Sequence, residues 1–470
     1  MTHTIYRFLF ILLLSAAGGC TVSKDLAVQS VTIADTFRNA RSADTATIAD
    51  LPYNKFFSDG ALLQLIDRAI QKNYDMQLAL RNIESAQRVL AQTKWGYAPD
   101  ARLLATASTS RPSDNSLNGL SLKEFLGTKH IEDFTTALVL SWEADIWGKV
   151  KNQKRSAFAS YLQTDEARKI VQTDIVTGVS KGYYNLLMLD AQLQVARKNL
   201  ALNDSTLRII RLQFEAGQLT SLAIQQAEAQ RLEAAKLVPE LEKNINIQEN
   251  ALSILAGDFP AATERNLALD QLSFENNLAT GVPASLVSRR PDVRSSELAL
   301  TIANANLGIT KAAMYPSLSI TATGGVNAFK ASNWFNIPAS LFGTAAASIA
   351  QPLIQKKQLK TQYELAKLER EKTILRFRQS VLYAVGEVTD ALIKIGKLKN
   401  QYEIAELRVT TLQLAIQNAN LLFQNGMANY LEVITAQSNV LQSELELTIL
   451  KRDRLAAGVE LYTALGGGWK

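Results

Sequence analysis

The stretches FEAGQLTSLAIQQAEAQ (residues 214–230) and FQNGMANYLEVITAQSN (residues 423–439) share one pattern. In each, Phe is followed after two residues by Gly, then by an apolar stretch, and then by Ala and Gln. Gly217 and Gly426 are separated by nearly half of the 470-residue chain. A repeat of this length is half a domain rather than a short solenoid unit. The sequence therefore predicts a tandem duplication, which excludes most ordinary enzyme folds.

Further matches flank the two stretches. Tyr97-Ala98-Pro99 recurs as Tyr315-Pro316, and Leu255-Ala256-Gly257 recurs as Leu465-Gly466-Gly467. We therefore expect one body built from two halves. The first repeat is predicted at residues 61–257 and the second at residues 291–470, with residues 258–290 as the crossover between them.

Composition supports a large folded core. Hydrophobic residues make up 47% of the chain and charged residues 20%, which does not indicate disorder. The 50 Lys and Arg against 44 Asp and Glu give a net charge of +6, with both signs mixed along the sequence. Because there is no basic block, nucleic acid is not expected as a partner.

The N-terminus is typical of an exported protein. An apolar run at residues 8–14 follows Arg7 and ends in small residues, which predicts a signal peptide at residues 1–19. Cys20 is the only cysteine and suits lipidation after cleavage, so residues 20–60 are expected to form a lipid-anchored segment. The site resembles a bacterial lipoprotein signal, although Ala17 stands where Leu is usual, and Thr21 implies the outer membrane. The alternative is an ordinary signal peptide with an incidental cysteine.

Proline spacing predicts long helices. Proline is absent between Pro112 and Pro239 and after Pro352, and it breaks helix interiors. Apolar residues recur every fourth position from Val171 to Leu187, the period of an amphipathic helix. Helices are expected over residues 62–93, 149–202, 292–313, 359–399 and 403–465. Gly217 and Gly426 lie where helix-stop residues are expected, so each half should hold two antiparallel helices that meet at a tip.

Between these helices, each half has two stretches of another kind. Polar residues alternate with apolar or small ones over residues 102–110, 134–142, 318–326 and 341–351, a weak signature of membrane barrel strands. Aromatic residues cluster at their ends, as at bilayer interfaces: Trp95, Tyr97, Trp142, Trp147, Tyr315, Phe329, Trp334 and Phe335. The alternative is a small soluble sheet with aromatic corners. Four strands cannot close a barrel, so a chain that spans the membrane this way must oligomerise.

The residues that usually carry catalysis are nearly absent. His130 is the only histidine outside the predicted signal peptide, and neither a phosphate-binding loop nor GxGxxG occurs. The Gly466-Gly467-Gly468 run is interpreted as a flexible tail. We expect no catalytic residue, no cofactor site and no metal site, and we do not expect an enzyme.

The helix tips hold the candidate functional residues, namely Gly217, Gln218, Leu219, Gly426, Asn429, Glu432 and Thr435. An acidic side chain repeated around a ring of tips would attract cations. The alternative for Glu432 is an exposed carboxylate that stabilises the start of its helix.

One resemblance is specific. The lipoprotein signal, the duplication, residues 281–294 (GVPASLVSRRPDVR), residues 303–316 (ANANLGITKAAMYP) and the tips together resemble the outer membrane efflux protein family, in its lipoprotein branch that serves resistance-nodulation-division pumps. The resemblance covers nearly all of the mature chain. It implies a mainly α chain with a membrane β-barrel: a homotrimer whose twelve strands form the barrel and whose twelve helices continue it as a periplasmic tunnel.

The resemblance also implies a gate at the periplasmic tips. Glu432 matches an acid of the family's constriction, whereas Thr435 stands where some members have a second acid. Ala428 and Phe423 replace a basic and a hydroxyl-bearing residue. Apolar packing is therefore expected to hold the tips together here.

The implied function is a passive outer membrane exit channel of a tripartite efflux system. Its partners would be a periplasmic adaptor, an inner membrane pump and outer membrane lipid, and its cargo drugs, toxic small molecules or metal ions. One alternative is an outer membrane duct for type I protein secretion. The other is a soluble periplasmic coiled-coil scaffold.

Overall fold

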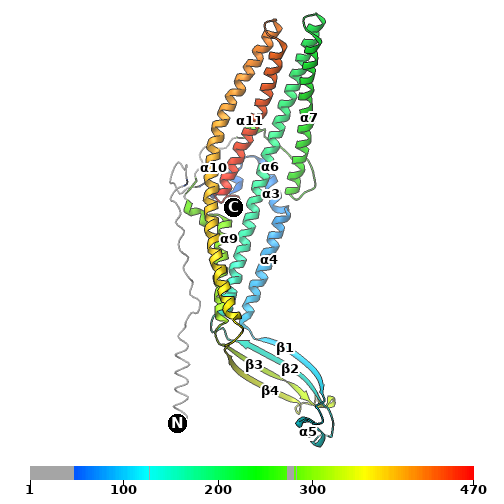
Figure 1. Cartoon of the computed structure of the whole chain (residues 1–470), viewed down its shortest axis with the longest axis vertical. Helices are drawn as coiled ribbons and strands as arrows, with labels where there is room; N and C mark the ends of the chain where they lie inside the picture. Colours follow the sequence, from blue (N-terminus) through cyan, green and yellow to red (C-terminus); the bar gives the residue numbers. More distant parts are fainter. Residues whose placement is uncertain (1–36, 38–46, 126, 273–279, 282) are drawn as a thin grey trace. The chain divides into compact units, whose positions relative to one another are not determined.

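The computed structural model describes residue 37 and residues 47–125, 127–272, 280–281 and 283–470 (Figure 1). The predicted signal peptide and Cys20 lie outside the described residues. The described chain forms two compact units. A strand unit comprises residues 85–161 and 298–375, and a helical unit comprises the described residues of 30–84, 162–297 and 376–470.

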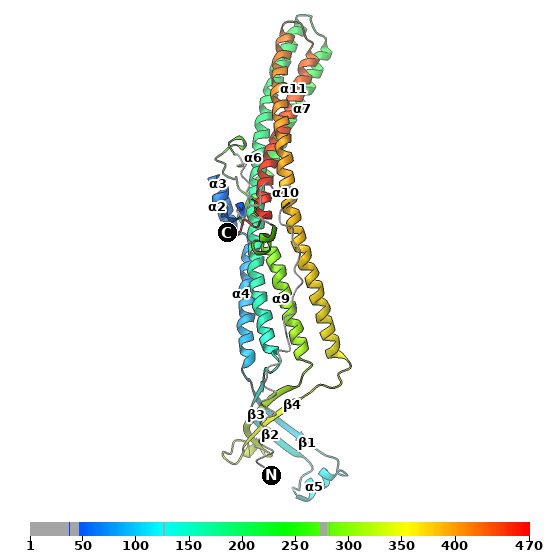
Figure 2. The same cartoon turned by 90° about the vertical axis from the view of Figure 1, so that its left-hand side faces the viewer.

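Helices dominate both repeats. The α-helices are α2 (Tyr53–Phe56), α3 (Gly60–Lys72), α4 (Tyr74–Lys94), α5 (Leu117–Phe125), α6 (Lys149–Glu215), α7 (Ser221–Leu255), α8 (Leu286–Arg289), α9 (Pro291–Ala312), α10 (Gln358–Gln424) and α11 (Tyr430–Ala464). In two perpendicular views, α6 lies beside α7 and α10 lies beside α11 (Figure 1, Figure 2). Each pair is an antiparallel hairpin, and the two hairpins repeat the same design.

Several predicted helix ends are wrong. The helix expected to end at residue 202 continues as α6 to Glu215, because Leu207 and Ile210 extend its buried face. The break expected at residues 399–403 does not occur, since α10 passes through this polar run and ends only at Gln424. The single helix expected over residues 62–93 is divided at Asn73, whose Oδ1 accepts the backbone N–H of Asp75 at 2.8 Å and so caps α4.

Pro239 does not mark the end of a helical tract. It lies inside α7, which has buried residues on both sides of it, among them Ala234 and Leu241. Packing along this face therefore outweighs the loss of one backbone hydrogen bond.

Both hairpin tips close with the same turn. Gly217 and Gly426 have φ angles of 74° and 73°, which residues other than glycine rarely adopt. The N–H of Gln218 bonds to the carbonyl of Gln213, and the N–H of Met427 bonds to that of Leu422, both at 2.9 Å. This is the turn by which glycine ends a helix, so the repeated glycine of the sequence terminates the first helix of each hairpin.

The strand unit holds one antiparallel sheet of four strands in the order β1-β2-β3-β4. They are β1 (Asp100–Ser110), β2 (Ile131–Glu143), β3 (Ser317–Ala328) and β4 (Leu341–Ala350). β1 and β4 lie at the two edges of the sheet, so each presents a row of backbone groups without a strand partner among the described residues.

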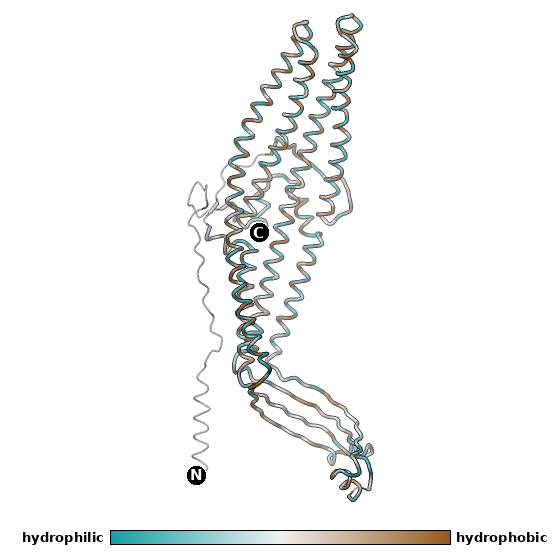
Figure 3. Tube along the Cα trace, viewed as in Figure 1, coloured by the Kyte–Doolittle hydropathy of each residue, from teal (hydrophilic) through white to brown (hydrophobic). Residues whose placement is uncertain are grey.

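The two faces of the sheet differ in chemistry. Register places Leu103 beside Leu138, and Leu138 beside Gly324, so alternate residues of all strands share a face. One face carries Leu103, Leu138, Leu140, Ile320, Leu341 and Ile349, and the other carries Thr106, Thr135, Ser141, Thr321, Thr323, Thr344 and Ser348. The sheet is thus apolar on one side and rich in hydroxyl groups on the other. The hydropathy trace shows the mixing of both kinds of residue along strands and helices (Figure 3).

Aromatic side chains gather at both ends of the strands. Where the strands join the helices, Trp142 Nε1 donates to the carbonyl of Tyr97 at 2.9 Å, and the Trp147 and Tyr315 rings stack at 4.9 Å. At the opposite end, the rings of Phe134, Trp334 and Phe335 form a chain of contacts. This is the double belt expected of a sheet that crosses a bilayer.

The C-terminal glycines are not a flexible tail. Gly466, Gly467 and Gly468 are buried in the helical unit, and a Cβ on Gly467 would lie 2.4 Å from the Tyr462 ring. The Tyr462 ring is itself fully buried, and it stacks on Phe56 at 4.0 Å. The chain passes through the core here, so these positions leave little room for a larger side chain.

Candidate pore and helix-tip site

An apolar cluster joins the two hairpins near their tips. It consists of Leu207 and Ile210 from α6, Ala223 and Ala227 from α7, Phe423 from α10 and Val433 from α11, all buried. We call this set the tip cluster. Removing these side chains from water stabilises the contact between the hairpins, at about 25 cal/mol for each Å² of apolar surface buried. The expectation that apolar packing holds the tips together therefore has a counterpart in the structure.

Polar contacts also cross between the hairpins. Tyr430 Oη donates to Gln226 Oε1 at 2.6 Å, which links α11 to α7. Deeper in the bundle, the fully buried Gln437 donates through Nε2 to Thr206 Oγ1 at 2.6 Å. Among the described residues, Gln437 Oε1 has no hydrogen-bond partner. Buried polar contacts of this kind are sensitive to the exact placement of both helices.

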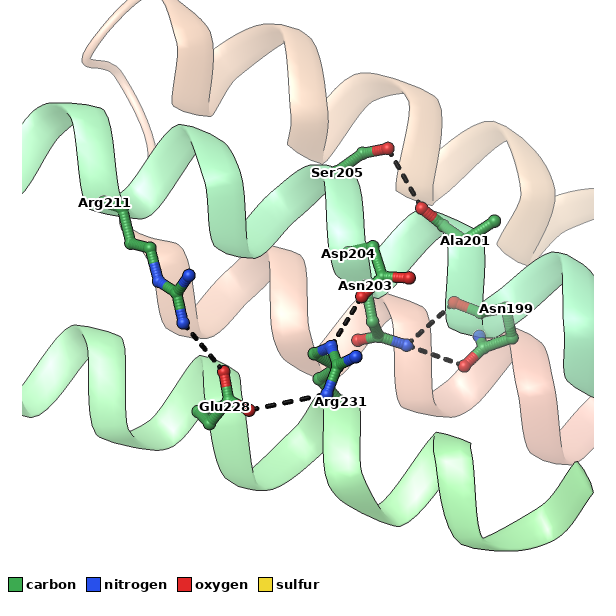
Figure 4. Close-up of polar contacts among 8 residues, drawn as sticks. All are labelled: Asn199, Ala201, Asn203, Asp204, Ser205, Arg211, Glu228 and Arg231. Atoms are coloured by element: carbon green, nitrogen blue, oxygen red, sulfur yellow. Dashed lines mark hydrogen bonds and ion pairs between the residues drawn. The ribbon is translucent and has the colours of Figure 1, made fainter.

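Ion pairs tie the first hairpin together close to its tip. Arg231 of α7 donates to Asp204 of α6 at 2.5 Å and lies 3.5 Å from Glu228, which in turn accepts from Arg211 of α6 at 3.2 Å (Figure 4). These side chains are partly exposed, so each pair contributes little alone. As a connected network, however, they hold the two helices of the first hairpin in one register.

The second hairpin lacks such a network near its tip. Its polar ties are Arg408 to Glu446 at 3.0 Å and Gln413 to Glu444 at 2.7 Å. Within the described chain from residue 414 to residue 443, no side-chain hydrogen bond or ion pair joins α10 to α11. The second tip is therefore held by apolar packing and by its polar contact with the first hairpin.

The predicted tip residues lie in the two turns and at the start of α11. Gly217, Gln218 and Gly426 are exposed, and Leu219 packs partly against the tip cluster. Asn429 caps α11, because its Oδ1 accepts the backbone N–H of Glu432 at 3.1 Å. The carboxylate of Glu432 lies in the first helical turn, where the helix dipole favours negative charge.

Glu432 and Thr435 begin an exposed polar strip on α11. Asn439 and Gln442 continue it at helical spacing, while Val433, Gln437 and Val440 form the buried face. A polar strip of this length suits contact with water.

An exposed apolar strip runs along α10. Ile404, Leu407, Leu414 and Leu421 are between 58% and 70% exposed and recur at three- or seven-residue intervals. We call this set the α10 strip. Large side chains at this spacing are typical of a helix that packs against another helix.

The RRPD motif has a structural role that the sequence did not reveal. Arg290 is buried and donates to Asp292 at 2.6 Å, to Glu387 of α10 at 2.5 Å and to the carbonyl of Ala464 in α11 at 3.1 Å. Burial acts to raise the pKa of Asp292, but the hydrogen bond and charge of Arg290 outweigh it and keep that pKa below its ordinary value. Arg290 therefore joins the start of α9 to both helices of the second hairpin.

The ion pairs of the first hairpin and the contact of Gln437 with Thr206 were not predicted from the sequence either. A signal for the ion pairs was present, because Asp204 and Arg231 lie about equally far from Gly217 on its two sides. Such residues face each other in an antiparallel hairpin. The Gln437 contact had no comparable signal, since it joins helices from different repeats.

The described residues contain no group of three or more His, Cys, Asp or Glu side chains that could hold a metal ion.

In the part of the chain that the structure describes, no helix combines the length and the apolar character needed to cross a membrane.

Comparison with known proteins places these features in a family. The model for the family described as outer membrane efflux protein matches residues 65–258 and 282–467. The chain is 27% identical to the cation efflux system protein CusC of Escherichia coli O6:H1 over 97% of both chains. It is 28% identical to the solvent efflux pump outer membrane protein SrpC of Pseudomonas putida, over 88% of this chain and 87% of that protein.

A solved structure agrees with the fold. A crystal structure of CusC superposes on this chain with a TM-score of 0.84. It is 25% identical in sequence and covers 95% of this chain and 100% of that chain.

Proposed function

The chain belongs to the outer membrane efflux protein family, and from this membership we propose that its second hairpin tip gates the exit channel that the chain provides for a tripartite efflux system. The observation that carries the proposal is the asymmetry of the tips. The first hairpin is tied internally by the Arg231 network, whereas the second has no polar tie near Gly426 within the described chain. Glu432 lies on the tip that lacks such a polar tie.

The channel is a homotrimer. Each chain supplies a four-stranded sheet with free edges at β1 and β4, and three such sheets close a barrel of twelve strands. The apolar face, with Leu103 and Leu138, then faces lipid, and the face rich in Thr and Ser lines the water-filled interior.

Work is divided between the channel and its partners. An inner membrane pump and a periplasmic adaptor deliver the cargo, and this chain conducts it passively to the exterior. The relatives are named for cations in one case and for solvents in the other. Such different cargoes fit a permissive channel whose selectivity lies in the pump, and efflux is favoured over a secretion duct or a soluble scaffold.

Glu432 is the residue that best tests the gate. In a trimer three copies of its carboxylate would line one ring, and such a ring attracts cations. We expect Glu432→Gln to lower the preference for cations over anions by about twofold to fivefold. The measurement is the reversal potential of single channels in planar bilayers under a salt gradient.

Glu432→Asp is the matched control, because it keeps the charge and shortens the side chain. It should retain most of the cation preference. If Glu432→Gln leaves the reversal potential of the parent channel unchanged, then Glu432 does not line the constriction.

Lipidation of Cys20 is a separate proposal. It rests on the sequence, in which the only cysteine follows the predicted signal peptide. We expect the mature parent chain to begin at Cys20 and to carry the added mass of acyl groups, and Cys20→Ser to lack that mass. Intact-mass spectrometry of protein purified from membranes makes the measurement. A parent chain without acyl mass would contradict the proposal.

A further inference from the structure

Gln226 and Tyr430 form the exposed polar link between the two tips. The phenol of Tyr430 donates to Gln226 Oε1 at 2.6 Å. We propose that Gln226 of the first tip positions Tyr430, and through it the start of α11 with Glu432, so that the first tip sets the geometry of the gate. This inference rests on the proposed function of the second tip as the gate.

Tyr430 is well placed to orient the pore residues. It is the first residue of α11, directly after the capping Asn429 and in the same turn as Glu432. Its ring packs against the tip cluster, and its hydroxyl reaches across to α7. The first turn of α11 is therefore held by its own cap, by apolar packing and by one hydrogen bond to the first hairpin. Only the hydrogen bond depends on a polar side chain of the other repeat.

The contact between the two tips is asymmetric, with the first hairpin as the more rigid side. Phe423 is 4% exposed inside the tip cluster, whereas Phe214, its counterpart in the first repeat, is 41% exposed. The second tip thus inserts its phenylalanine between the hairpins and the first does not. Because the first hairpin is also braced by Asp204, Arg231 and Glu228, it is the rigid side of the contact. A change at Gln226 should therefore reach Glu432 more readily than the first hairpin itself.

The equivalent residues of the two repeats do not form a second, reciprocal link of this kind. At the position equivalent to Tyr430, the first repeat has Ser221, and at the position equivalent to Gln226 the second repeat has Thr435. Neither Ser221 nor Thr435 can reproduce the long contact in reverse. The link therefore belongs to the divergence of the repeats and not to their shared pattern.

The test is a double-mutant cycle on the assembled channel. Tyr430→Phe removes only the hydroxyl, and Gln226→Leu removes the side-chain amide whose oxygen accepts its hydrogen bond. Each single variant should change the fraction of time in the main conducting state by about twofold to tenfold, the range that one hydrogen bond supports. The double variant should change it no more than either single variant, because both remove the same bond. Each should also shift the cation preference measured for Glu432.

Two controls separate positioning from general damage. Gln225→Leu makes the same change at the neighbouring exposed residue of α7, and Tyr402→Phe removes a hydroxyl that donates within α10 to Glu406 at 2.9 Å. Both controls should behave as the parent channel. All variants should remain trimers on native gels, since a purely structural defect would lower trimer recovery without a coupled change in ion preference.

Two results would overturn the inference. Parent-like gating and ion preference in both single variants would show that the bond positions nothing. Multiplying effects in the double variant would show that the two residues act independently. Either result leaves the channel itself intact, whereas a parent trimer that does not conduct would contradict the proposed function instead.

Discussion

A Leu407→Glu, Leu414→Glu double variant is expected to lose the trimer and to be recovered from detergent as a monomer. Both residues belong to the α10 strip and are exposed in the single chain. We expect this strip to pack against neighbouring copies in the trimer, where burying one leucine contributes about 1.5–3 kcal/mol. Replacement loses this contribution at both positions in all three copies and places carboxylates without partners in an apolar contact. The measurement is the molar mass of the detergent-solubilised protein by light scattering.

Gln417→Glu is the control for this variant. It adds a carboxylate on the exposed surface of the same helix, to the side of the α10 strip. It should leave the molar mass of the trimer unchanged. A trimeric Leu407→Glu, Leu414→Glu variant would show that the α10 strip does not contact a neighbouring copy.

Gly467→Ala is expected to destabilise the helical unit, although it adds a single methyl group. The new Cβ would lie 2.4 Å from Tyr462 Cε2 and 2.6 Å from Cζ, well inside van der Waals contact. Tyr462 has little room to move, because its ring stacks on Phe56 and its hydroxyl donates to the carbonyl of Leu51 at 2.7 Å. Overpacking of this kind costs about 1–3 kcal/mol. The measurement is the Tm of the solubilised trimer, which should fall by several degrees.

Gly60→Ala is the matched control. It makes the same substitution at the first residue of α3, where a Cβ would meet no atom within 4 Å. Its Tm should equal or slightly exceed that of the parent, because alanine favours helix more than glycine does. If Gly467→Ala unfolds at the parent temperature, the C-terminal segment is not packed as described.

The duplicated design could be predicted from the sequence because it depends on local signals. The two glycines needed a positive φ, and polar residues alternated with apolar or small ones along the stretches that form strands. The pairing of the strands was not predicted. Helix ends were harder, because they depend on packing at a distance. α6 continues past residue 202 since Leu207 and Ile210 find partners in the other hairpin, and Pro239 is tolerated since α7 is packed on both sides of it.

The candidate site was predictable in position but not in its contacts. Glu432 could be identified from the sequence as an acid at a helix start, whereas the role of Asn429 as the helix cap was not predicted. The contact of Tyr430 with Gln226 joins residues far apart in sequence, so no local pattern indicated it. The same holds for Arg290, whose bonds to Glu387 and Ala464 depend on how three helices meet.

The free edges at β1 and β4 have a consequence for biogenesis. A lone chain would expose two rows of unpaired backbone groups to hydrocarbon, which costs several kcal/mol for each group. We therefore expect insertion into the membrane and assembly to be a single event, which a higher local concentration of newly exported chains favours. It also follows that a subunit with a damaged edge strand disables the two intact subunits that it joins, so such a defect would be dominant when both forms are produced in one cell.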